Sequence, residues 1–134
     1  NMLNSDENNI DINEIQDLLS QLQIFNISET VIYSLVAALG INIRYIHILK
    51  GQIYDKLNGT NYYSDLKNIN ILPLTSNRIF TIGTTIFLLI NYNNFVKASN
   101  SDESESNKTD AFENYFATAL ILFATILSGS NINL

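Results

Sequence analysis

Cysteine is absent from this sequence of 134 residues, so neither a disulfide nor a thiolate zinc site can form. There is a single histidine, His47, and catalysis by a Ser-His-Asp or Cys-His arrangement would need it. His47 lies within a helical repeat of apolar residues and has no nucleophile motif beside it, which is typical of a side chain on a helix face. The five glycines form no phosphate-binding loop, and the sequence has no Glu-x-x-His pair for a carboxylate-bridged metal centre. We therefore expect no enzymatic activity, no cofactor and no metal.

Basic residues are few and unevenly distributed. Residues 1–43 hold six acidic and no basic residues, residues 44–97 hold six basic and two acidic, and residues 98–134 hold five acidic and one basic. A chain with net charge −6 and no basic run is a poor nucleic-acid binder, because phosphate neutralisation supplies most of that affinity. We expect no nucleic-acid partner, whereas the cationic middle third suits an acidic peptide.

No hydrophobic run is long and uninterrupted. Residues 79–96 and 112–127 are the only transmembrane candidates that the sequence suggests. Asn91, Asn93 and Asn94 interrupt the first, and the second has Glu113 and Asn114 near its start. Each segment therefore has only about fifteen uninterrupted apolar residues, whereas a helix needs ~20 to span a bilayer. We expect soluble core helices. The alternative is a membrane-inserted helical hairpin or an uncharacterised bacterial helical bundle. The polar, acidic N-terminus predicts no signal peptide.

The length predicts a single domain that buries roughly two thirds of its unfolded surface. Residues 76–95 and 111–128 are apolar or small on nearly every side, and a helix of that kind is buried. We expect these two segments to pack together as a central hairpin, with amphipathic helices around it. Pro73 is expected to separate the first of them from the preceding segment, with Ser76 as its N-cap.

The N-terminal half predicts amphipathic helices. Residues 11–25 carry apolar residues at three-to-four spacing, with acids in the first turns where the helix dipole favours them. The same spacing continues through residues 31–57, but Gly40 and Gly51 each cost about 1 kcal/mol in a helix interior. We therefore expect two separate helices, over residues 29–42 and 43–58. The apolar positions of this run are Ile32, Val36, Leu39, Ile43, Ile46, Leu49, Ile53 and Leu57.

The remaining segments are shorter. Residues 61–69 are expected to form a short helix after the Asn58-Gly59 stop signal. Residues 97–110 (KASNSDESESNKTD) are expected to form a mobile acidic loop, because the segment is too hydrophilic to pack. Thr109 or Asp110 would then cap the last helix. Residues 1–10 are polar and are expected to be frayed.

Tyrosines alternate with cations before the central hairpin. Aromatic side chains bordered by cations are typical of a groove that receives an amphipathic helix and pairs its acidic residue at the rim. The alternative is that each tyrosine places its ring in the core and its hydroxyl in water. The residues concerned are Tyr33, Tyr45, Tyr54, Tyr62 and Tyr63, with Arg44, Lys50, Lys56 and Lys67.

Four segments carry a resemblance to a known family: residues 17–22 (DLLSQL), 28–30 (SET), 76–82 (SNRIFTI) and 109–111 (TDA). With amphipathic helices expected around an apolar hairpin, they resemble the divergent poxviral Bcl-2-like proteins. The Asn-Trp-Gly-Arg box of cellular members appears here only as residues 75–78 (TSNR), without Trp or Gly. The chain would then be an all-α, Bcl-2-like helical bundle.

The resemblance implies a viral inhibitor of apoptosis that binds BH3 helices of pro-apoptotic host proteins in a surface groove. It places the protein in the host cytoplasm or at the mitochondrial outer membrane, with membrane contact only through a tail outside this sequence. An alternative keeps the fold but assigns a dimeric modulator of innate immune signalling. The arginine that pairs with the acidic residue of a BH3 helix would be Arg78. The groove wall would be Tyr45, Ile46, Leu49, Ile53, Tyr62, Tyr63, Leu66 and Ile82.

Overall fold

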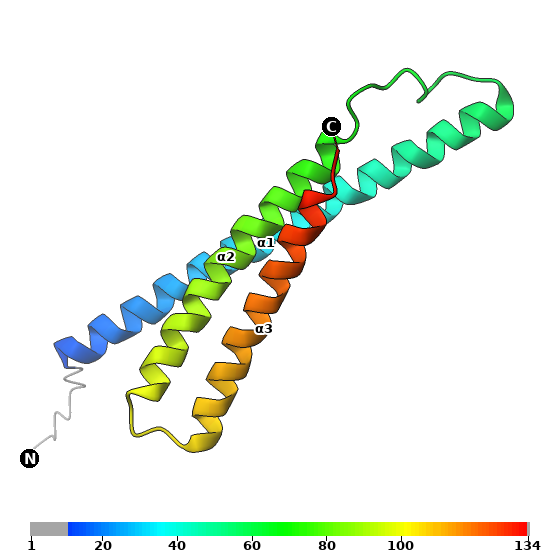
Figure 1. Ribbon diagram of the computed structural model, residues 1–134. Coiled ribbons are helices and arrows are strands. Elements are labelled where there is room, and N and C mark those ends of the chain that lie inside the picture. The colour runs from blue at the N-terminus through cyan, green and yellow to red at the C-terminus, as the bar shows by residue number, and fades with distance from the viewer. Residues whose placement is uncertain (1–10, 134) are drawn as a thin grey trace, which may run out of the picture.

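The computed structural model describes residues 11–133, and over this range it contains three α-helices and no strand. They are α1 (Ile12–Asn58), α2 (Ile71–Ser99) and α3 (Glu105–Ser130) (Figure 1). The expected all-α helical bundle is therefore confirmed. The fraying expected for residues 1–10 falls outside the described residues.

Helix α1 is a single helix of 47 residues, about 70 Å long at 1.5 Å per residue. The expected division into helices over residues 11–25, 29–42 and 43–58 was wrong. The backbone passes through Gly40 and Gly51 without a break, because about 1 kcal/mol per glycine is small beside the hydrogen bonds of a helix this long. The Asp11 side chain caps the start by accepting from the Asn13 amide, and the helix ends at Asn58, with Gly59 as a left-handed C-cap at φ of 65°.

The segment between α1 and α2 also differs from the prediction. Residues 61–69 form turns, not a helix, and α2 begins at Ile71. Pro73 does not separate two elements, because it lies in the first turn of α2, where its missing N–H breaks no helical hydrogen bond. Ser76 is consequently not an N-cap. Its side chain is 1% exposed, and its hydroxyl donates to the Ala38 carbonyl of α1 at 3.1 Å.

The connection from α2 to α3 spans only residues 100–104, so the loop expected over residues 97–110 is shorter than predicted. Ser104 caps α3 by accepting from the Asn107 amide, which moves the cap five residues ahead of the expected Thr109. Most of the acidic segment is therefore helical.

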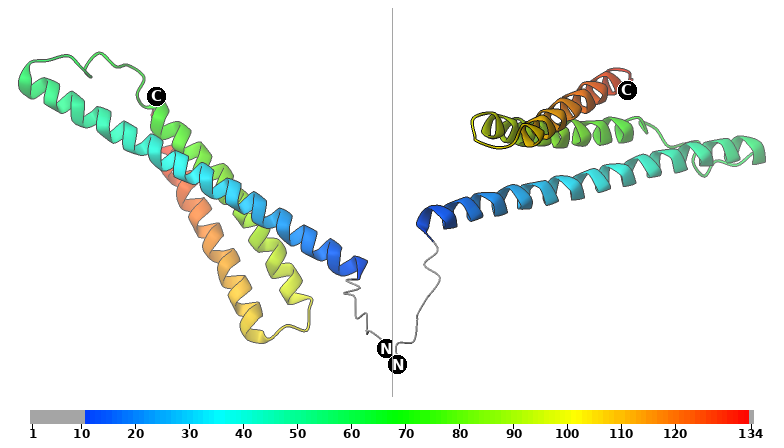
Figure 2. Two further views of the ribbon diagram at one scale, coloured as in Figure 1. Left: turned by 180° about the vertical axis from the view of Figure 1, so that it is seen from behind. Right: turned by 90° about the horizontal axis from the view of Figure 1, so that it is seen from below.

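Helix α2 lies in the middle of the arrangement. It packs against α3 on one side and crosses α1 on the other, whereas α1 and α3 do not pack on each other. Figure 2 shows α1 as a separate layer beneath the α2–α3 hairpin. The predicted hairpin is thus present, but among residues 11–133 no element covers the outer side of α3.

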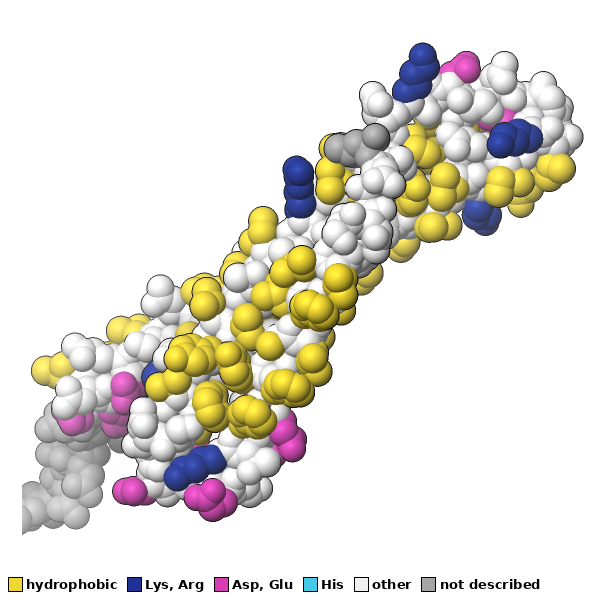
Figure 3. All heavy atoms as spheres, in the orientation of Figure 1, with side chains coloured by type: hydrophobic (Ala, Val, Ile, Leu, Met, Phe, Trp, Pro, Cys, Tyr) yellow, Lys and Arg dark blue, Asp and Glu magenta, His cyan; other side chains and the backbone are white. Residues whose placement is uncertain are grey.

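The buried interior is small and contains few large apolar side chains. Only four described hydrophobic residues are buried, Val31, Ala38, Ile48 and Ala98, together with the polar Asp55, Ser76, Thr84 and Thr118. In contrast, 29 large hydrophobic side chains are exposed, and Figure 3 shows them spread over the visible face. Phe116 and Phe123 of α3, for example, are 53% and 62% exposed. The hairpin expected to be buried is therefore open to its surroundings on one side.

Candidate functional site

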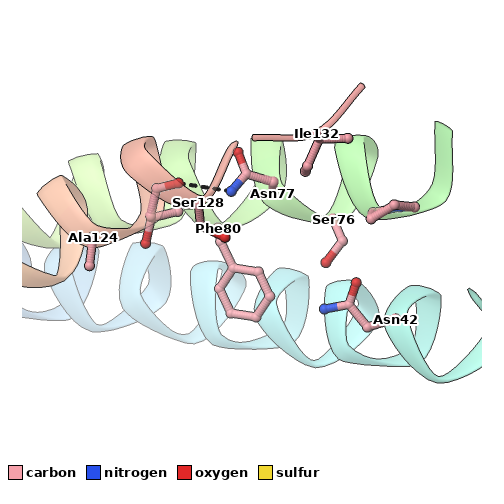
Figure 4. Close-up of a pocket in the computed structure, with 9 residues that line it drawn as sticks. Asn42, Ser76, Asn77, Phe80, Ala124, Ser128 and Ile132 are labelled. Atoms are coloured by element: carbon pink, nitrogen blue, oxygen red, sulfur yellow. Dashed lines mark hydrogen bonds between the residues drawn. The ribbon is translucent and has the colours of Figure 1, made fainter. Parts of the chain in front are cut away.

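A cavity of about 400 Å³ with mixed polar and apolar lining lies where residues of α1, α2 and α3 come together (Figure 4). Its polar lining comes from all three helices, and its apolar lining comes from Pro73, Phe80, Ala124 and Ile132. Asn42 of α1 points into it opposite Ser76 of α2. The polar lining residues are Asn42, Ser76, Asn77, Thr125 and Ser128.

Two hydrogen bonds between helices hold the walls of this cavity. Ser76 ties α2 to α1 through the Ala38 carbonyl, and Asn77 Nδ2 donates to the Thr125 carbonyl of α3 at 2.9 Å. Gly129 makes the second contact possible, because a Cβ at this position would collide with the Asn77 amide. The cavity walls therefore depend on small residues that let the helices approach closely.

No ionisable side chain lines the cavity, so it offers neither a general acid or base nor a charged anchor. It provides amide and hydroxyl groups beside an aromatic ring, which suits water or an uncharged polar group. We therefore regard it as a site of polar contact between helices.

The second polar cluster surrounds Asp55 near the end of α1. Its carboxylate is 3% exposed and accepts hydrogen bonds from the Thr60 hydroxyl, from the backbone amides of Tyr62, Tyr63 and Ser64, and from the Ser64 hydroxyl. Burial by itself raises the pKa of Asp55, but the hydrogen bonds from Thr60 and from the three amides outweigh it and hold the pKa well below its usual range. Asp55 thus fastens the loop after α1 back onto the helix.

Tyr63 completes this fastening. Its ring lies over Gly51, where a Cβ would collide with it, and its hydroxyl is 3.4 Å from Nε2 of His47. The Gln52 side chain donates to the Tyr63 carbonyl at 3.4 Å. The glycine that we expected to break α1 instead receives the ring of the following loop.

The structure divides the residues predicted to form a BH3 groove. Arg78 and Ile82 lie one turn apart on α2, both exposed, and both border a shallow hollow between α2 and α3. Ile82 also borders an apolar groove of about 370 Å³ between α1 and α2, together with Thr30, Val31, Ser34, Ala37, Ile79, Gly83 and Ile86. Of the predicted set, this groove contains Ile82 alone.

The other predicted groove residues lie toward the far end of α1 and in the loop after it. Ile46 and Ile53 are exposed on α1 and Leu49 is half-buried there, whereas Tyr62 and Leu66 are exposed in the loop. Tyr45 is half-buried, and its hydroxyl bonds to the side chain of Asn70 at 3.3 Å, while Tyr63 packs on α1 as described. These side chains and Arg78 do not line a common cavity among those found in the described residues.

Sequence reasoning missed the polar residues that join α2 to α3. Asn77, Thr84 and Asn91 recur every seven residues in α2, as do Thr118 and Thr125 in α3, and this spacing puts each set on one helix face. Asn91 Nδ2 donates to the Thr118 hydroxyl at 2.7 Å, and Thr84 is buried. Polar residues at heptad spacing inside apolar helices were the signal for this interface.

Comparisons with protein-family models, with curated proteins and with solved structures found no match to this chain. The functional interpretation therefore depends on the chain's own residues and geometry.

Proposed function

We propose that this chain is a membrane-embedded helical protein whose three helices pack together within a lipid bilayer. The observation that carries the proposal is the inverted distribution of its side chains. Large apolar residues point outward, whereas Ser76, Thr84 and Thr118 are buried between helices. In water this arrangement forgoes most of the hydrophobic stabilisation of folding, but in a bilayer the outward side chains face lipid.

The exposed area supports the same interpretation. The chain exposes 10417 Å², whereas a compact monomer of 15.1 kDa exposes roughly 7,100 Å² by the usual scaling with mass. Ten residues account for at most about 1,700 Å² even when fully extended, so residues 1–10 do not explain the difference. A surface this large and this apolar needs lipid or another partner to cover it.

All three helices are long and apolar enough to cross a membrane, by length and composition. Only residues 79–96 and 112–127 were expected as candidates, because α1 was predicted as separate helices over residues 11–25, 29–42 and 43–58. Helices α1 and α2 run side by side from a hollow that Gln23 and Ile86 both line to the hydrogen bond between Tyr45 and Asn70, the residue before α2. The 23 residues of α1 in this range extend about 34 Å, which matches the ~30 Å hydrocarbon core with a modest tilt.

The contacts between helices are those that membrane proteins use. Without water to drive apolar side chains together, membrane helices associate through small residues and hydrogen bonds between helices. Gly83 fits this pattern, since a Cβ at that position would lie 3.1 Å from side-chain carbons of both Val31 and Leu35 of α1. The bonds from Ser76, Asn77 and Asn91 are the polar part of the same pattern.

Extraction from membranes tests the proposal. The full chain, expressed in bacteria, should stay in the membrane fraction after alkaline carbonate and after urea, and should be released by detergent. A stable, monodisperse monomer in detergent-free buffer would overturn it. A monodisperse oligomer in that buffer would overturn it too, and would show that protein covers the apolar surface.

One observation favours a second candidate, the Bcl-2-like inhibitor of apoptosis. Arg78 is exposed and lies one turn from Ile82 at the edge of the apolar groove between α1 and α2. A BH3 helix in that groove would place its acidic residue against Arg78, a charge-assisted contact worth about 1.5 to 3 kcal/mol. Detergent-free protein titrated with BH3 peptides should then bind, and Arg78→Ala should weaken binding roughly 10-fold to 150-fold. A soluble protein that binds no peptide would point to the dimeric signalling alternative.

A further inference from the structure

Charge is separated along the long axis of the molecule. The end formed by residues 44–58 of α1 and the loop over residues 59–70 holds four Lys or Arg and two acids; we call it the basic end. The opposite end, formed by residues 11–22 of α1 and by residues 97–113 around the α2–α3 connection, holds two Lys and eight acids. Figure 3 shows cations mostly toward one end of the visible face and acids mostly toward the other.

The folded loop makes the basic end more cationic than its composition alone suggests. Asp55, one of its two acids, turns its carboxylate inward to the loop amides and is 3% exposed. Lys50, Lys56 and Lys67 are all exposed. The surface that this end presents is therefore dominated by lysine and arginine.

Exposed tyrosines accompany these cations. Tyr54 is 58% exposed and Tyr62 is 82% exposed, so neither side chain packs in the protein core. Tyrosine is enriched at the level of lipid headgroups, where its ring meets the acyl chains and its hydroxyl meets water. Lysine and tyrosine together at one end of a helical membrane protein are the features that contact anionic headgroups at the cytoplasmic surface.

We infer that the basic end lies at the cytoplasmic face of the membrane against anionic headgroups, with the α2–α3 connection on the opposite side. The inference depends on the proposed membrane location. The bilayer is crossed from the acidic end by α1, back by α2 and again by α3, since α2 is antiparallel to both of its neighbours (Figure 1). Short loops rich in Lys and Arg stay on the cytoplasmic side of a membrane, and this preference sets the orientation of the three helices.

The absence of cysteine makes the orientation directly measurable. Asn61→Cys places a single thiol at the basic end, and Asn100→Cys places one in the α2–α3 connection; both positions are exposed. In intact bacterial cells, a membrane-impermeant maleimide should label Asn100→Cys, and Asn61→Cys only after lysis. The reverse pattern, or protection of both thiols in intact cells, would overturn the orientation. The membrane location would still stand if both variants remained in the membrane fraction after carbonate. Release of both variants by carbonate would overturn the membrane proposal itself.

A charge series tests whether the lysines are the cause. Lys50→Gln, Lys56→Gln and Lys67→Gln combined should reduce external labelling of Asn100→Cys from nearly all molecules to roughly half. The matched control, Lys97→Gln with Lys108→Gln, removes cations from the acidic end and should leave the labelling unchanged. Unchanged labelling in the triple variant would show that the basic end does not set the orientation.

Discussion

At the scale of single residues, Asp55 is the clearest case of one side chain organising a segment. Its carboxylate accepts from Thr60 and from three successive amides, so Asp55→Asn replaces an acceptor by a group that donates where the amides donate. We expect exchange of the Tyr62, Tyr63 and Ser64 amides to accelerate roughly tenfold or more, measured by hydrogen exchange. Unchanged exchange would contradict the role given to this carboxylate.

The same residue predicts a pH dependence. Because the pKa of Asp55 is lower in the folded loop than its ordinary value of 3.8, its contribution is full above pH 3.8. The contribution is lost as the pH falls below 3.8 toward the lowered pKa. Amide protection in the loop should therefore persist at pH 5 and decline only in stronger acid, and Asp55→Asn should remove this dependence.

The hydrogen bonds between α2 and α3 give a second prediction for single residues. Asn77→Ala and Asn91→Ala each remove a donor to α3, and each should lower the stability of the protein in detergent micelles by about 0.5 to 2 kcal/mol. Asn94→Ala is the matched control, because Asn94 is exposed. Equal effects at all three positions would show that these bonds do not hold the hairpin.

At the scale of the helices, the surroundings of two glycines show which helix face is in contact with a neighbour and which is not. Gly83 of α2 lies against Val31 and Leu35 of α1, whereas a Cβ at Gly40 would meet nothing within 4 Å. We expect Gly83→Leu to lower stability by about 1 to 3 kcal/mol through overpacking. Gly40→Leu should not lower it and should raise it by up to about 1 kcal/mol, because leucine is the better helix former and meets no neighbour there. Thermal unfolding in micelles measures both, and a larger effect at Gly40 would mean that an additional partner covers that face.

The helices were predicted only in part from the sequence pattern. The apolar character of residues 76–95 and 111–128 predicted the central parts of α2 and α3. Residue composition was sufficient there, because long apolar stretches without a break favour a helix that avoids water. The breaks expected in α1 were wrong for two reasons: at Gly51 the following loop packs the Tyr63 ring on the glycine, and at Gly40 the cost of one glycine is small beside the hydrogen bonds of a long helix. Most of the predicted groove residues lie close together in the sequence, between residues 45 and 66. Of the whole predicted set, only Ile82 lines the groove between α1 and α2.

At the scale of the whole molecule, the outward apolar side chains distinguish a bilayer from water. Phe123 is 62% exposed near the middle of α3. If it faces lipid, Phe123→Lys should cost about 2.5 to 3.5 kcal/mol of insertion free energy and reduce the membrane-inserted fraction. Glu113→Lys, near the start of the same helix, should have little effect. A more soluble Phe123→Lys protein with an unchanged fold would instead indicate that α3 faces water.

The sequence by itself determined that this protein is helical, that two segments are mainly apolar, and that six of its seven Lys and Arg lie within residues 44–97. These properties depend on residue type and spacing, which act locally. Only the tertiary structure decided which faces meet. Because α1 is one continuous helix and α2 is the only described helix that packs on it, the side of α3 away from α2 and a stripe along α1 stay uncovered, while serine, threonine and asparagine occupy the contacts. Burial is a property of the assembled helices, so an apolar helix alone does not reveal whether protein or lipid surrounds it.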